Sequence, residues 1–281
     1  MGARVLSHQD ASDFDFDVVC KGTGIDDASV AYARRKVHAA ARAATAPVLF
    51  GRIKITHEPH RTIERPIVVA ASLDVDGHLV RAHAAGHTAM EAVDLLEERL
   101  RGQLLEAHQR IAFLRRRHAG VATPGEWRHG DESTARPGFV PRPPGEREVI
   151  RTKAFSLDRC TPEAAVVRME MLDHDFHLFI DSATGADAVV KRLPGGEYEL
   201  SRATGDEDEP QDIVELRTGP RPPTLAVESA MERANDTDQP FLFFVDAATS
   251  RGSVLYRRPD GHYGVVQAEL PLSSAFGKEH R

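Results

Sequence analysis

Apolar and polar residues alternate with two different periods over the first 118 positions of the chain. A period of two, which is typical of half-buried strands, occurs in four segments: Phe16–Lys21, Val48–His57, Pro66–Val75 and Leu79–Ala85. After the first of them, Asp26 or Asp27 can cap a helix that runs to about residue 44. Asp76-Gly77 is a hairpin turn signal between the third and fourth strands.

A second helix, from about residue 88 to about residue 117, is the clearest periodic element. Its apolar residues recur every three or four positions: Val93, Leu96, Leu100, Leu104, Ala107, Ile111 and Leu114. Arg99, Arg110 and Arg117 fall on one flank of this apolar stripe. Arg101 and Arg115 fall on the other flank. Two interpretations stay open, namely arginines that only solvate the helix or a basic edge that meets phosphate groups.

The order of these elements, β-α-β-β-β-α, predicts an α+β domain at residues 14–118. Two helices side by side on its sheet would resemble the modules that bind double-stranded RNA by shape and phosphate position. The first helix adds basic residues to such a surface: Arg34, Arg35, Lys36 and Arg42.

The carboxy-terminal half contains one pattern twice. Phe176–Leu200 aligns without a gap with Phe241–Val265 at an offset of 65 residues, and ten of the 25 positions are identical. Each copy has the pattern of a strand, a helix and a three-stranded meander, which predicts β-α-β-β-β domains at residues 148–203 and 212–270. Because a unit of about 50 residues is marginally stable alone, we expect the two domains to pack together as an intramolecular pseudo-dimer.

The side chains that we expect between these two domains are apolar or aromatic: Phe176, Leu178, Phe179, Tyr198, Phe241, Phe243 and Tyr263. Residues 119–147, rich in proline and glycine, are predicted to be a flexible linker. The acidic segment 205–211 (GDEDEPQ) between the copies is predicted to be a solvated spacer.

The net charge of −7 is distributed unevenly. Residues 1–120 contain 17 basic and 15 acidic residues, whereas the remainder contains 19 and 28. This distribution argues against adhesion of the whole surface to nucleic acid, so that any RNA contact should come from the first part. The amino terminus has no signal-peptide pattern and no apolar run approaches about 20 residues, which predicts a cytoplasmic protein without a membrane span.

No catalytic or metal-binding motif stands out. The pairs His57/His60 and His174/His177 lack the helical spacing of zinc ligands. Cys20 and Cys160 are far apart in the sequence and suggest neither a disulfide framework nor a zinc site. A glycine-rich phosphate loop and a nucleophile elbow are also missing from the sequence. We therefore expect a protein that is not an enzyme and needs no cofactor or metal.

Several segments resemble a known family. The first is Asp94–Leu104 (D-x-x-x-E-R-L-x-x-Q-L), preceded by Arg81-Ala82. Stronger matches are Ile150–Phe155, Met169–Phe176 and Tyr256–Val266. By these residues the chain resembles the long form of the bacterial ribosome hibernation promoting factor, in the sigma-54 modulation protein family. The duplicated carboxy-terminal domain resembles an actinobacterial type of this family.

The resemblance implies a first domain that binds the small ribosomal subunit in the decoding region, through 16S rRNA, and involves neither DNA nor a membrane. There it would block the mRNA and tRNA sites and hold idle ribosomes inactive during stress or dormancy. The rRNA-binding residues carried over from the family are Arg35, Lys36, Arg42, Arg81, Arg99, Arg101 and Arg110.

The duplication departs from the ordinary long form, whose single carboxy-terminal domain pairs with that of a second molecule and so joins two ribosomes. With both copies on one chain, we expect a monomer that silences single ribosomes without joining them. The first domain is also less basic than is usual in the family, and Met90 replaces a frequent aromatic residue. The alternatives are an RNA-binding regulator that does not meet ribosomes and a protein-interaction adaptor in the stress response.

Overall fold

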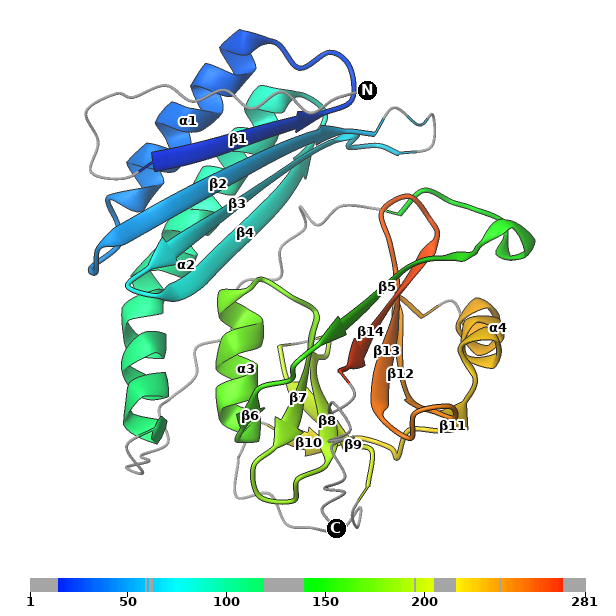
Figure 1. Ribbon diagram of the computed structural model, residues 1–281. Helices are drawn as coiled ribbons and strands as arrows, with labels where there is room; N and C mark the ends of the chain where they lie inside the picture. Colours follow the sequence, from blue (N-terminus) through cyan, green and yellow to red (C-terminus); the bar gives the residue numbers. More distant parts are fainter. Residues whose placement is uncertain are drawn as a thin grey trace, which may run out of the picture.

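The computed structural model describes residues 15–58, 60, 63–118, 139–194, 196–204, 216–237 and 239–269. These residues form an amino-terminal α+β unit and a carboxy-terminal module of two five-stranded sheets (Figure 1). The α+β class predicted from the sequence is confirmed. Most of the predicted linker and the acidic segment 205–211 lie outside the described residues. No helix in the described ranges is long and apolar enough to cross a membrane.

The amino-terminal unit contains a four-stranded sheet with the order β1-β2-β3-β4. Its elements are β1 (Asp15–Lys21), α1 (Asp27–Ala41), β2 (Val48–His57), β3 (Ile67–Val75), β4 (His78–Gly86) and α2 (Ala89–His118). β1 runs parallel to β2, whereas the other neighbouring strands are antiparallel. Both helices cover one face of the sheet and leave the other face open (Figure 1).

Local chemistry explains where these elements begin. Asp26 caps α1 by accepting a hydrogen bond of 2.8 Å from the backbone N–H of Ser29. The hydroxyl of Thr88 accepts a bond of 3.2 Å from the N–H of Glu91 and so caps α2. Asp76 and Gly77 have φ angles of 53° and 80°, as the tight turn between β3 and β4 requires.

The carboxy-terminal module contains one sheet with the order β10-β9-β8-β7-β6 and a second with the order β11-β12-β13-β14-β5. The first sheet and its helix comprise β6 (Arg159–Cys160), α3 (Pro162–Met171), β7 (Phe176–Asp181), β8 (Asp187–Arg192), β9 (Tyr198–Arg202) and β10 (Leu216–Thr218). The second comprises β5 (Val149–Phe155), β11 (Thr224–Leu225), α4 (Val227–Thr237), β12 (Phe241–Asp246), β13 (Gly252–Arg257) and β14 (Tyr263–Ala268), with η1 (Pro144–Glu146) before β5. α3 and α4 flank the two sheets on opposite sides (Figure 1).

The two copies exchange their first strands. β5 precedes the first copy in sequence, yet it pairs with β14 of the second copy. β10, which occupies the equivalent position before the second copy, pairs with β9 of the first. From the order of the elements in the sequence, β5 is expected in the sheet of the predicted domain at residues 148–203. Each sheet is therefore completed by a strand from the other copy.

Chain length explains this exchange. If β5 occupied the place of β10, it would lie four strand spacings, or about 19 Å, from β6. Only four residue steps connect Phe155 to Arg159, and these span about 14 Å when fully extended. β5 therefore cannot reach the far edge of its own sheet, whereas the edge of the neighbouring sheet is accessible to it.

The two sheets pack face to face through apolar side chains. Leu178, Val189 and Val254 are buried between them, with Phe176, Phe241 and Phe243 at the border. The rings of Phe176 and Phe241 have centroids 4.9 Å apart. Four of the seven side chains expected in this interface thus lie in it.

The other three, Phe179, Tyr198 and Tyr263, lie on the opposite faces of their sheets. Phe179 and Tyr198 belong to the core under α3, and Tyr263 belongs to the core under α4. This corrects the expected interface, because successive residues of a strand point to opposite faces of its sheet.

Candidate nucleic-acid interface

The basic residues expected to contact rRNA lie in two different environments. Arg35 and Arg42 are exposed on α1, and the Arg35 guanidinium lies 5.5 Å from the centroid of the Tyr32 ring. Lys36 is paired with Asp94 at 2.9 Å and with Glu97 at 2.6 Å. These hydrogen bonds raise the pKa of the Lys36 ammonium above its ordinary value.

Arg101, near the middle of α2, completes this group. Its guanidinium lies 2.8 Å from Glu97, one helical turn earlier, and about half of its side chain is exposed. Such exposed pairs contribute little to stability. Arg35, Arg42 and Arg101 are exposed to an anionic partner, whereas the Lys36 ammonium is held by two carboxylates. We call these four residues the helix surface.

Arg99 has a different environment, because the first copy of the carboxy-terminal domain covers it. Its guanidinium lies 2.6 Å from the carboxylate of Asp173, whose side chain is 1% exposed. The other oxygen of the same carboxylate lies 2.6 Å from Nδ1 of His83 and accepts a bond of 3.0 Å from its backbone N–H. Asp173 thus binds both α2, through Arg99, and β4, through His83.

Arg110 and Arg81 also face the first copy. Arg110 is 9% exposed and lies 3.7 Å from Glu170 of α3. Glu170 in turn accepts a bond of 3.0 Å from the Tyr198 hydroxyl. Arg81 lies 3.4 Å from Nε2 of His174. Three of the seven expected rRNA contacts are therefore occupied by side chains of the same chain.

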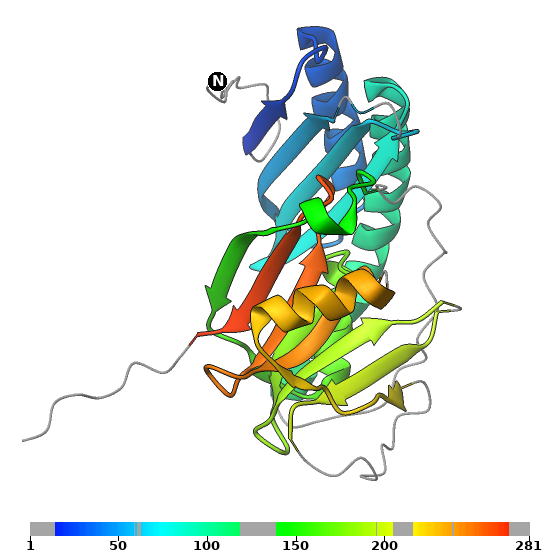
Figure 2. The same cartoon turned by 90° about the vertical axis from the view of Figure 1, so that its right-hand side faces the viewer.

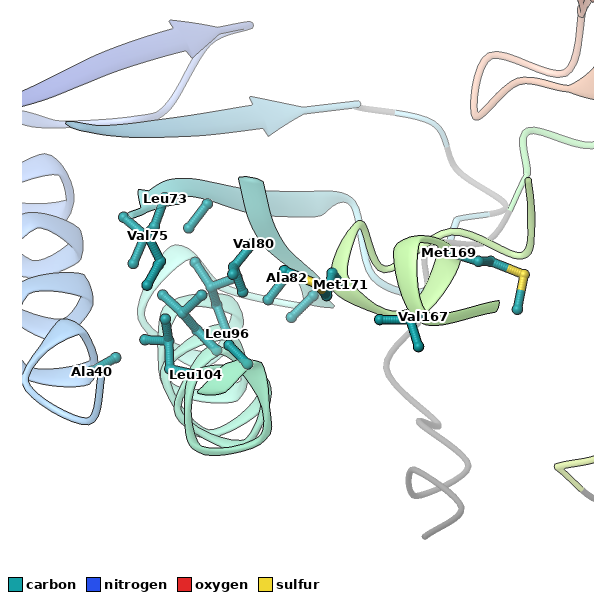
Figure 3. Close-up of a cluster of buried hydrophobic side chains, with 14 of the residues drawn as sticks. Ala40, Leu73, Val75, Val80, Ala82, Leu96, Leu104, Val167, Met169 and Met171 are labelled. Carbon is teal, nitrogen blue, oxygen red and sulfur yellow. The ribbon is translucent and has the colours of Figure 1, made fainter. Parts of the chain in front are cut away.

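Apolar contacts accompany these ion pairs. One continuous core cluster contains buried residues of the amino-terminal unit together with those of α3. Figure 3 shows Met171 of α3 beside Ala82 of β4, close to Leu96 of α2. The amino-terminal unit and the first copy are thus docked through a mixed apolar and ionic interface.

Sequence reasoning did not identify Asp173 and Glu170 as docking residues, although both lie in the segment Met169–Phe176 that resembles the family. Both carboxylates lie at the end of α3 next to the apolar residues Val167 and Met171. Acidic residues that border an apolar helix face indicate a partner with basic residues. This signal was present in the sequence but did not say which helix would be the partner.

Two histidines around the start of β7 are held neutral. Burial, reinforced by the charge of Arg81, lowers the pKa of His174 to about 4. Burial and the charge of Arg168 lower the pKa of His177 to about 4. Nε2 of His177 is buried without a hydrogen-bond partner among the described residues.

We expect stability to fall when the pH decreases from 7.5 to 5. A histidine in the unfolded chain has a pKa of about 6.5. Between about pH 6.5 and 4 the unfolded chain therefore binds protons that the folded chain does not bind. The stabilisation is complete above about pH 6.5 and is lost as the pH approaches 4, by on the order of 3 kcal/mol per histidine at full effect. Urea unfolding followed by circular dichroism at both pH values measures it. The variant His177→Leu should show a weaker pH dependence, and equal midpoints at both pH values would contradict the expectation.

Comparison with known proteins identifies the domains of the carboxy-terminal half. The family model "Sigma 54 modulation/S30EA ribosomal protein C terminus" matches twice, at residues 144–200 and 208–265. A dormancy associated translation inhibitor of Mycobacterium tuberculosis is 39% identical over 135 residues, which are 44% of this chain and 48% of that protein. The match thus spans about half the length of this relative.

Two further relatives are ribosome hibernation promotion factors. That of Staphylococcus aureus is 46% identical over 55 residues, or 20% of this chain and 29% of that protein. That of Lactococcus lactis is 28% identical over 143 residues, or 49% and 72%. Among solved structures, the N-terminal domain of Thermus thermophilus Protein Y aligns with a TM-score of 0.27 and 18% identity, covering 32% of this chain and 92% of that one.

The family model matches in tandem over the part of the chain in which the sequence repeats itself and in which each sheet is completed by the other copy. The chain therefore contains, twice in tandem, a domain that matches the carboxy-terminal domain of the sigma-54 modulation/S30EA ribosomal protein family.

Proposed function

We propose that this chain is a ribosome hibernation factor that binds the small subunit in the decoding region, blocks the mRNA and tRNA sites and stabilises idle ribosomes. The observation that carries the proposal is the tandem family domain, together with relatives named for hibernation and translation inhibition. The proposed role is one of binding and includes no enzymatic activity.

The amino-terminal unit supplies the rRNA contact in this proposal. The helix surface is accessible in the docked arrangement and meets rRNA phosphates as point charges that position the unit without reading sequence. Arg81, Arg99 and Arg110 join this contact when rRNA phosphates displace the side chains of the first copy. Phosphate suits these arginines because a guanidinium binds phosphate and carboxylate oxygens with the same geometry.

The carboxy-terminal module acts within one chain in this proposal, which makes the factor a monomer. Asp187 of the first copy binds Arg251 of the second through distances of 2.7 and 2.9 Å. Asp187 also accepts a hydrogen bond of 2.8 Å from the backbone N–H of Gly252. Gly252 is the residue of the second copy at the position equivalent to Asp187. If the first copies of two molecules paired in the same way, the carboxylate of Asp187 would face the Asp187 carboxylate of the other molecule. The first copy is therefore complementary to the second copy rather than to another first copy.

A sucrose-gradient profile of ribosomes mixed with the purified chain tests the proposal. We expect the chain to sediment with single ribosomes and to form no ribosome-pair peak. A ribosome-pair peak would refute the monomeric action, while chain that stays at the top of the gradient at low and moderate salt would refute ribosome binding and favour an adaptor.

The variant Arg35→Glu/Arg42→Glu/Arg101→Glu should weaken this co-sedimentation by at least about tenfold, because three accessible phosphate contacts are reversed. Its matched control is Arg159→Glu/Arg217→Glu/Arg233→Glu, which reverses three exposed arginines of the carboxy-terminal module. Equal weakening by both variants would mean that only net charge matters, and would count against the helix surface.

A further inference from the structure

Among the cations that form no ion pair with any residue in the described ranges are Lys21, Lys54, Arg151 and Lys153. Many other arginines and lysines are paired, including Lys36, Arg99, Arg202 and Arg251. We call the four unpaired cations the basic patch. An unpaired charge is ordinary at an isolated surface position. Four positive charges that repel one another need an explanation.

Two members lie on the open face of the amino-terminal sheet. Lys54 of β2 pairs in register with Val19 of β1, and Lys21 pairs with Thr56, so that the two lysines are diagonal neighbours on one face. On the other side of Lys54, the register continues through Ala70 to His83. Small side chains on β3 therefore leave the lysine accessible from the open face.

The other two members lie on β5, at the edge of the second sheet. Arg151 and Lys153 are two residues apart and pair in register with Gly264 and Val266 of β14. The hairpin between β13 and β14, which carries Arg258, lies beside the amino-terminal sheet in both views (Figure 1, Figure 2). Docking thus brings β5 and this hairpin next to the open face.

The electrostatic effects agree with this placement. Partial burial lowers the pKa of Lys54, and the charges of Lys21, Arg151 and Arg258 lower it further, while Glu58 opposes them. Partial burial also lowers the pKa of Lys153, with contributions from Arg151, Arg81 and Arg258. Cations from both parts of the molecule therefore repel one another, and an anion between them would relieve this repulsion.

Three basic residues of this module have no basic counterpart at its other, equivalent end. At the offset of 65 residues, Arg151 and Lys153 correspond to Leu216 and Thr218 of β10. Arg258 corresponds to Leu193 in the turn of the first copy. The other end carries Arg217 on β10 at the position of Thr152, where it is paired with Glu197. The three positions of Arg151, Lys153 and Arg258 are basic only at the end that faces the amino-terminal unit, which links them to the docked arrangement rather than to the fold of the repeat.

We propose that the basic patch binds the phosphate backbone of RNA and is a second RNA contact, assembled when the amino-terminal unit docks on the carboxy-terminal module. RNA fits because its backbone offers one phosphate per nucleotide and can satisfy cations on several strands at once. The patch also continues into Arg81, one of the proposed rRNA contacts. This inference rests on the proposed function, since it concerns the orientation of the same chain on the same RNA.

Fluorescence anisotropy with a fluorescein-labelled RNA hairpin tests the inference on the full chain, between about 50 and 200 mM KCl. We expect the variant Lys54→Gln/Arg151→Gln/Lys153→Gln to bind about tenfold more weakly and to reduce the slope of log Kobs against log[KCl] by about 2. The matched control Arg159→Gln/Lys191→Gln/Arg217→Gln removes three cations from the first copy and should bind like the parent chain.

The variant Arg35→Gln/Arg42→Gln/Arg101→Gln, in the helix surface, separates this inference from the proposed function. If it binds weakly while the patch variant equals the control, the patch inference fails and the proposed function stands. If the parent chain binds neither the hairpin nor ribosomes, both fail. Flotation with phosphatidylserine vesicles gives the last comparison, because binding to vesicles in preference to RNA would assign the patch to an anionic membrane and overturn the inference.

Discussion

Replacement of Asp173 by asparagine will release the amino-terminal unit from the first copy. The change leaves Arg99 buried against a neutral group and removes the acceptor of the His83 ring. Removal of one partner from a buried ion pair costs about 3–5 kcal/mol, because the remaining charge is left uncompensated. Asparagine is preferred to alanine because residue 173 has a φ of 52°, a conformation that asparagine tolerates.

Small-angle X-ray scattering and urea unfolding measure this effect together. The parent chain should give the smaller radius of gyration and a single cooperative transition, and Asp173→Asn a larger radius and an earlier first transition. Asp158→Asn is the control, since it weakens a pair with Arg168 in which the Asp158 side chain is 55% exposed and should change stability by less than about 1 kcal/mol. Identical scattering from Asp173→Asn and the parent chain would show that the carboxylate does not hold the docked arrangement.

The second large effect is expected from Gly252→Asp, at the contact between the two copies. A Cβ atom on residue 252 would lie 2.7 Å from Cβ of Asp187 and 3.1 Å from the ring of Phe243. The new carboxylate would also oppose Asp187 and compete for Arg251. Overpacking alone costs about 1–3 kcal/mol, and the like charges add to it, so we expect a loss of at least about 3 kcal/mol.

A double-mutant cycle with Asp187→Gly makes this prediction specific. Asp187→Gly removes both the clashing side chain and the opposing charge. The double variant should therefore lose less free energy of unfolding than the sum of the two single variants, by more than about 1 kcal/mol. Gly102→Asp is the matched control, because no atom lies within 4 Å of a Cβ built on Gly102. Strict additivity of the two changes would refute the direct contact between residues 187 and 252.

Periodicity in the sequence was sufficient to predict the amino-terminal unit. The alternation of Ile53, Ile55 and their neighbours predicted β2, and the stripe through Leu96, Leu100 and Leu104 predicted the buried face of α2. These signals are local, since they depend only on which side chains avoid water. The same reasoning predicted that Phe176 and Phe241 lie between the sheets.

The two features that govern the site were not predictable in this way. Alternation shows which face of β5 is apolar, but not which sheet edge accepts its hydrogen bonds, and β14 and β9 offer equivalent edges. The flank of α2 with Arg99 and Arg110 suggested a partner, and either RNA or a carboxylate satisfies an arginine. The choice of Asp173 and Glu170 in the structure depends on contacts between residues more than 50 positions apart.

The exchange of first strands has a consequence for how the chain folds as it is synthesised. β9 meets β10 soon after both have left the ribosome, because Tyr198 and Leu216 are 18 positions apart. β5 must wait much longer, since Val149 and its partner Tyr263 are 114 positions apart. The second sheet can therefore close only when nearly all described residues have been made. Each copy stays incomplete without the other, so the duplicated halves of this module form one cooperative folding unit and not two.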